Sequence, residues 1–121
     1  MKSNINKEIV LDKEHPIYMG IDVHKKTWSI SLIHRDEIIK KSTLPAEWMV
    51  FEKFLAPYRG YKTYSVYEAG FSGFWLHHKL EGHGVKNIVT APNKLPVVVG
   101  DLVKTDKRDS LKLAHYLSKD L

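Results

Sequence analysis

Residues 17–44 have the sequence IYMGIDVHKKTWSISLIHRDEIIKKSTL, and this stretch decides the fold class of the chain. Apolar and polar residues alternate along three parts of it, residues 17–24, 28–33 and 38–44, with the period of a β-strand. The intervening pairs Lys25-Lys26 and Asp36-Glu37 are polar and short enough for tight turns. We therefore predict three strands that form an antiparallel meander.

The rest of the chain alternates predicted helices with predicted strands. Helices are expected over residues 45–55, with Pro45 in the first position, over 75–80 and over 106–117, since apolar residues recur there at helical spacing. Strands are expected over residues 62–67, rich in Tyr, Val and Thr, and over 85–90. Four large aromatic residues are expected in the core: Trp28, Trp48, Phe51 and Trp75.

The resulting order β-β-β-α-β-α-β-α is that of an α/β protein. Because β-α-β crossovers are right-handed, the fourth strand is expected beside the first and parallel to it, which gives the strand order 3-2-1-4-5. A mixed five-stranded sheet of this order, flanked by helices, is the arrangement of ribonuclease H-like folds. We expect residues 1–16 to form a polar N-terminal extension and residues 17–121 to form the folded domain.

Composition limits the class of protein. The length of 121 residues suits one domain, and the absence of cysteine excludes a disulfide framework and a cysteine-type zinc site. No apolar run approaches the ~20 residues of a transmembrane helix, so we expect a cytoplasmic protein without membrane contact. The 19 Lys and Arg against 14 Asp and Glu give a net charge of +5. This charge suits a nucleic-acid partner, but solubility of a small protein explains it equally well.

Two carboxylates are expected at one edge of this sheet. Asp22 lies in the most apolar strand, on a face that it shares with Gly20 and His24, and Glu68 ends the fourth strand. If the first and fourth strands are neighbours, the two carboxylates come close together and repel unless a cation lies between them. Each also has a structural interpretation, because Asp22 could accept turn hydrogen bonds and Glu68 could precede a helix N-terminus.

Asp106 and Asp109 stand three residues apart at the start of the last predicted helix, so they project from one helical face. Asp106 suits the N-cap position, whereas Asp109 falls deeper in the first turn. Together with Asp22 and Glu68 they offer the oxygen ligands that Mg²⁺ or Mn²⁺ prefers. Two such ions would activate a water or hydroxyl and stabilise the leaving oxygen of a phosphodiester. We predict a metal site at these four acids.

Basic residues neighbour the four acids in the sequence. Such side chains hold the phosphates of nucleic acids, although a solvated surface explains each of them taken singly. The predicted nucleic-acid-binding residues are Lys25, Lys26, Lys104, Lys107 and Arg108.

Three motifs resemble a known family when they are taken together and in order. They are Gly20-Ile21-Asp22-Val23-His24-Lys25, Tyr67-Glu68-Ala69-Gly70 and Lys104-Thr105-Asp106-Lys107-Arg108-Asp109-Ser110. They resemble the GIDVHK, E-A-G/T and K-T-D-x-x-D-A motifs of the DEDD transposases of the IS-one-ten class of bacterial insertion sequences. The resemblance covers residues 18–121. Ser110 stands where the family usually has Ala, a change that we expect to carry little chemical weight.

The resemblance implies a RuvC-like ribonuclease H fold in which Asp22, Glu68, Asp106 and Asp109 coordinate Mg²⁺ (or Mn²⁺) and act in catalysis. It implies DNA as the substrate, action at the bacterial nucleoid, an element-encoded guide RNA as a candidate partner and a homo-oligomeric full-length protein. The family carries a C-terminal domain with a serine thought to act as nucleophile, and no serine here matches that motif. We therefore expect this chain to be the N-terminal domain of a DNA transposase or recombinase.

Two alternatives stay open. One is a nucleic-acid-binding module of the same kind of transposase without activity of its own, which would bind DNA or RNA with a steep salt dependence. The other is an actin-like or sugar-kinase ATPase fragment, since that superfamily shares the sheet topology and an early Asp on its first strand. Its first turn is normally rich in glycine, whereas the turn here, His24-Lys25-Lys26-Thr27, contains none.

Overall fold

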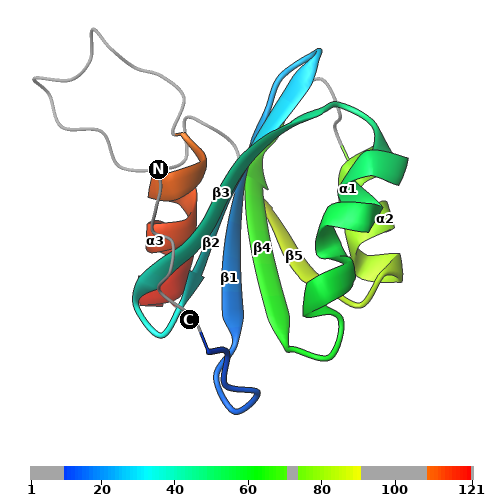
Figure 1. The fold of residues 1–121 in the computed structure, drawn as a ribbon. Helices are drawn as coiled ribbons and strands as arrows, with labels where there is room; N and C mark the ends of the chain where they lie inside the picture. Colours follow the sequence, from blue (N-terminus) through cyan, green and yellow to red (C-terminus); the bar gives the residue numbers. More distant parts are fainter. Residues whose placement is uncertain (1–9, 71–73, 91–108, 121) are drawn as a thin grey trace, which may run out of the picture.

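The computed structural model of the protein describes residues 10–70, 74–90 and 109–120 (Figure 1). Its strands form one five-stranded sheet in the order β3-β2-β1-β4-β5, which confirms the predicted α/β class and strand order and is consistent with a ribonuclease H-like fold. Along the chain the elements are β1 (Ile17–Val23), β2 (Thr27–His34), β3 (Glu37–Pro45), α1 (Trp48–Leu55), the 3-10 turn η2 (Ala56–Tyr58), β4 (Thr63–Glu68), α2 (Trp75–Gly82), β5 (Lys86–Thr90) and α3 (Ser110–Asp120).

The sheet combines a meander with parallel crossovers. β1 pairs antiparallel with β2, and β2 with β3, while β4 runs parallel to both β1 and β5. The turn between β2 and β3 lies at Arg35 and Asp36, whose φ angles of 52° and 68° are those of a tight hairpin turn. It therefore comes one residue earlier than the predicted turn at Asp36-Glu37.

Two helices cover one face of the sheet, and this face holds most of the core. Figure 1 shows α1 and α2 on the side of the sheet opposite α3. The odd-numbered residues of β1 face α1 and α2, as the alternation of the sequence predicts. The buried residues of this cluster, the helix-pair core, are Ile17, Met19, Ile21, Val23, Trp28, Ile30, Leu32, Phe51, Leu55, Tyr67, Leu76, Leu80 and Val85.

Among the described elements, α3 covers the opposite face. Its buried apolar cluster consists of Val66 of β4 with Leu113 and Leu117 of α3. The partly buried rings of Tyr18 and Tyr64 stack at 5.7 Å between their centroids and pack against this cluster. The apolar contact of α3 therefore lies over the parts of β1 and β4 that precede Asp22 and Glu68.

Gly20 allows α3 to lie directly on β1. A Cβ atom at this position would overlap the carbonyl oxygen of Ser110 and would come within 2.5 Å of the amide nitrogen of Ala114. It would also lie 2.9 Å from the Cβ of Leu113. Real Cβ atoms are not found this close to backbone atoms, so the missing side chain sets the distance between helix and strand.

Two predictions about individual residues are wrong. Pro45 does not begin the first helix but ends β3, opposite Thr27, because an edge strand tolerates a residue without an N–H. Trp75 is 49% exposed and is not a core residue, although its ring contacts the buried Trp28 with 6.3 Å between centroids. Within the described residues, no helix has the length and apolar character that spanning a membrane requires.

Candidate functional site

One row of polar side chains crosses the sheet on the face that α3 covers. The strand register pairs Asp22 of β1 with Ser29 of β2, and Ser29 with Thr43 of β3. On the other side of β1, one further step of the parallel register sets Asp22 beside Glu68 of β4. Residues at one level on adjacent strands point to the same face. We call these four residues the polar row: Glu68, Asp22, Ser29 and Thr43.

The two acids of the polar row have little contact with water. The side chain of Asp22 is 16% exposed and Glu68 is 5% exposed. Two carboxylates at neighbouring positions repel each other, and burial increases the cost of that repulsion. The Nε2 atom of His24 lies 3.1 Å from Oδ2 of Asp22, so this histidine orients the Asp22 carboxylate, on the face that the sequence predicted for both.

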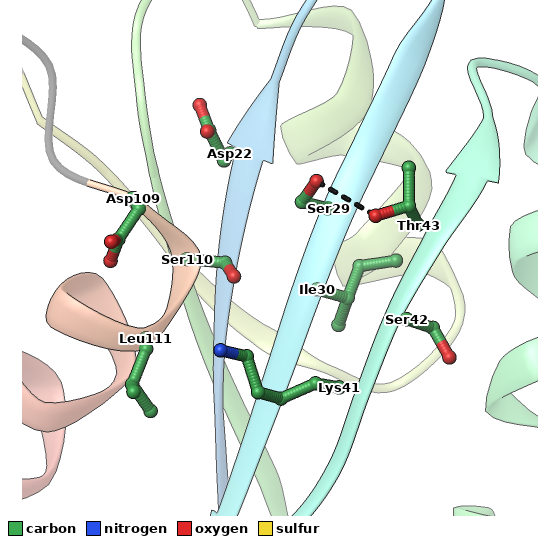
Figure 2. A pocket seen from close by; sticks show the side chains of 9 residues that line it. All are labelled: Asp22, Ser29, Ile30, Lys41, Ser42, Thr43, Asp109, Ser110 and Leu111. Carbon is green, nitrogen blue, oxygen red and sulfur yellow. Dashed lines mark hydrogen bonds between the residues drawn. The ribbon is translucent and has the colours of Figure 1, made fainter.

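A pocket of about 370 Å³ opens in front of this row, between the sheet and the start of α3 (Figure 2). It is built from β1, β2, β3 and the start of α3, so the meander and a segment distant from it in sequence both contribute to it. Most of its side chains carry a charge or a hydroxyl group. The lining residues are Asp22, Ser29, Ile30, Lys41, Ser42, Thr43, Asp109, Ser110 and Leu111.

Asp109 is the N-cap of α3. Its Oδ1 atom accepts a hydrogen bond from the backbone N–H of Lys112 at 2.9 Å, and its carbonyl accepts the N–H of Leu113 at 3.1 Å. The last helix, predicted over residues 106–117, is therefore observed over Ser110–Asp120, because the side chain of Asp109 caps it. The expectation that Asp109 lies deeper in the helical turn is wrong, and Asp106 lies outside the described residues.

The structure brings some of the predicted metal ligands together and not others. Asp22 and Asp109 line the same pocket, but Figure 2 shows their carboxylates pointing in different directions. Within residues 10–70, 74–90 and 109–120, no three His, Cys, Asp or Glu side chains form a group that could hold a metal ion. The predicted four-acid site, which also includes Glu68 and Asp106, stays a prediction.

The predicted nucleic-acid-binding residues fall into two groups. Lys25 and Lys26 are exposed in the turn between β1 and β2, which follows directly after the strand that bears Asp22. The others lie outside the described residues, and they are Lys104, Lys107 and Arg108.

The sequence interpretation missed the polar residues of β2 and β3 and underestimated Ser110. The hydroxyl of Ser110 is buried and lies 2.8 Å from the buried hydroxyl of Ser31, so this serine links α3 to β2. The expectation that it carries little chemical weight is wrong. The alternation of Ser29 and Ser31 with apolar residues was a usable signal that one face of the second strand is polar.

Comparison with known proteins finds no matching family model. The chain is 35% identical to the transposase for insertion sequence element IS1533 of Leptospira borgpetersenii over 105 residues, which are 84% of this chain and 30% of that protein. It is also 43% identical over 54 residues to y4qE of Sinorhizobium fredii, which is named a putative transposase. This alignment covers 45% of this chain and 14% of y4qE. The chain thus spans less than a third of each relative, and these relatives are proteins named as transposases.

Proposed function

We propose that this chain is the N-terminal, metal-dependent catalytic domain of a DNA transposase and acts on DNA phosphodiesters. The observation that carries the proposal is the position of Asp22 and Glu68 at one level on adjacent strands, on the face where a polar pocket opens. A bound cation stabilises two poorly hydrated carboxylates that lie side by side. The similarity to proteins named as transposases supports DNA as the substrate.

The donor atoms suit Mg²⁺ or Mn²⁺. Asp22 and Glu68 supply carboxylate oxygens, which these hard cations prefer, and in our proposal Asp106 and Asp109 complete the ligand set. When bound, such ions supply a Lewis acid that activates a water or hydroxyl and stabilises the leaving oxygen. His24 holds the Asp22 carboxylate through its 3.1 Å contact. The proposed contacts to DNA phosphates come from Lys25, Lys26, Lys104, Lys107 and Arg108.

Thermal unfolding with and without Mn²⁺ tests the proposal. A ligand that binds only the folded chain at a hundred times its dissociation constant stabilises it by about 2.7 kcal/mol. For a domain of this size we expect a rise in melting temperature of roughly 10 °C. The double variant Asp22→Asn, Glu68→Gln keeps the shapes of both side chains and should lose this rise.

Asp36→Asn is the matched control for that experiment. Asp36 is exposed in the turn between β2 and β3, at the opposite end of β2 from the polar row, and asparagine tolerates its positive φ. This variant should respond to Mn²⁺ as the unchanged chain does. An equal rise in the Asp22→Asn, Glu68→Gln variant would show that the proposed metal site is wrong.

A further inference from the structure

We propose that Ser29, Lys41 and Thr43 form a phosphate-binding subsite that holds a DNA strand beside Asp22. This inference rests on the proposed function and extends it, because it names residues of β2 and β3 that the three sequence motifs do not contain. The three side chains of the subsite come from β2 and β3 and line the pocket next to Asp22.

The strand register places the three residues on one face. Ser29 pairs with Thr43 and Ser31 pairs with Lys41, so Lys41 and Thr43 point to the face that bears Asp22. Figure 2 shows the Lys41 side chain extending from β3 across β2 toward β1, with its amine on the pocket side. The hydroxyls of Ser29 and Thr43 lie 3.2 Å apart, next to each other on the pocket wall.

The chemistry of these groups suits a phosphate. Phosphate oxygens only accept hydrogen bonds, and an ammonium group and a hydroxyl donate them. One hydroxyl of the Ser29–Thr43 pair donates to the other, which leaves the second hydroxyl to donate to a phosphate. In the part of the chain that the structure describes, the Lys41 amine forms no salt bridge, although Asp22 and Asp109 line the same pocket. Its charge is therefore not neutralised by a neighbouring carboxylate, and the amine is exposed to an incoming anion.

The position within the sheet suits an extended strand of nucleic acid. β3 is an edge strand, so the polar row is open to solvent at the Thr43 end. Adjacent strands lie about 4.8 Å apart, which puts Thr43 roughly 10 Å from Asp22 along the row. One oligonucleotide can reach both positions. The carboxylates at the other end of the row repel phosphate, which favours the hydroxyls of β2 and β3 as its binding position.

The test uses a fluorescein-labelled single-stranded DNA 12-mer and measures its anisotropy with the 121-residue chain, in EDTA and again in Mg²⁺, over a series of salt concentrations. The variant Lys41→Gln should weaken binding several-fold. It should also reduce the slope of log K against log salt concentration by about 0.7, the value for one lost phosphate contact on a single strand. Thr43→Val, which keeps the charge, should also weaken binding.

Lys40→Gln is the matched control, since it removes the same charge from the neighbouring residue. Lys40 is exposed and pairs with Leu32, whose side chain belongs to the helix-pair core, so it points to the opposite face. Equal losses in Lys40→Gln and Lys41→Gln would overturn the subsite and leave the metal site unaffected. Absence of DNA binding by the unchanged chain would also overturn it, and the Mn²⁺ melting experiment then decides separately on the metal site.

Discussion

The two faces of the sheet differ in what covers them and in what their strands present. The face under α1 and α2 is lined by the helix-pair core, in which Phe51 is fully buried and in ring contact with Trp28. The face under α3 has a small apolar cluster and, beyond it, the polar row. Because the first face holds most of the buried apolar surface, we infer that it supplies most of the stability and leaves the second face able to carry charged groups.

The α3 face accommodates polar groups because α3 packs beside the polar row and does not lie over it. The close approach of α3 is at Gly20, two residues before Asp22 on the same face of β1, and the helix begins at Ser110. Beyond that point the sheet is not covered by the described part of α3, and the pocket opens there. Gly20 thus allows α3 to pack closely on β1, and the pocket opens beyond that contact.

Removal of a large side chain from the helix-pair core should have the largest effect. Phe51→Ala deletes a fully buried ring that lies 5.6 Å from Trp28 and 5.6 Å from Trp48, measured between centroids. Because such truncations leave a cavity, we expect a loss of about 3 to 5 kcal/mol in the free energy of unfolding. Urea unfolding monitored by circular dichroism measures it, with the midpoint shifted at constant slope.

Met49→Ala in the same helix is the control for this loss. Met49 is 72% exposed, so its truncation should change the free energy of unfolding by less than about 0.5 kcal/mol. A similar loss for Met49→Ala and Phe51→Ala would mean that α1 does not pack on the sheet as described.

Gly20→Ala tests the close approach on the other face. The added Cβ overlaps backbone atoms of α3 that cannot move without displacing the helix, so we expect a loss of about 1 to 3 kcal/mol. Amide hydrogen exchange should rise in α3, at Ala114 above all, and stay unchanged in α1. Such a result would show that the two faces can be perturbed separately.

Gly82→Ala is the matched control, because nothing lies within 4 Å of a Cβ added there. Gly82 ends α2, and alanine in a helix is favoured over glycine by roughly 0.5 to 1 kcal/mol, so this variant should be neutral or slightly stabilised. Equal, small effects of Gly20→Ala and Gly82→Ala would contradict the packing of α3 directly on β1.

The sequence predicts the sheet well because local patterns and a handedness rule determine it. Alternation in residues 17–44 indicates the meander, and right-handed crossovers place the fourth strand beside the first, as observed. It predicts the ends of elements less well. Pro45 suits a helix start in isolation, and its pairing with Thr27 across the edge of the sheet cannot be deduced from local preference.

The positions of the candidate residues were predicted only in part, for a similar reason. Asp22 and Glu68 were predicted to be neighbours because strand order alone brings them together. Lys41 and Thr43 were missed because their relation to Asp22 depends on the exact register of three strands, which composition does not reveal. The position of Asp109 in the helix was predicted wrongly because Asp106, three residues earlier, is equally suited to the N-cap, and sequence alone does not choose between them.

The smallest expected effects are losses in the free energy of unfolding when either of two hydroxyl pairs on the α3 face is broken. Ser31→Ala removes the partner of Ser110 in a buried pair at 2.8 Å and should cost about 1 kcal/mol in the free energy of unfolding. Ser29→Ala breaks the exposed pair with Thr43 and should cost less than about 0.5 kcal/mol.

A double-mutant cycle distinguishes the contribution of the buried pair from that of either residue alone. The variant Ser31→Ala, Ser110→Ala should lose less stability than the sum of the two single variants, because each single change leaves one hydroxyl buried without its partner. Additive losses, or equal losses for Ser29→Ala and Ser31→Ala, would mean that α3 does not exclude water from Ser31. The close packing of this helix on the polar side of the sheet would then be wrong, and the pocket would extend beneath it.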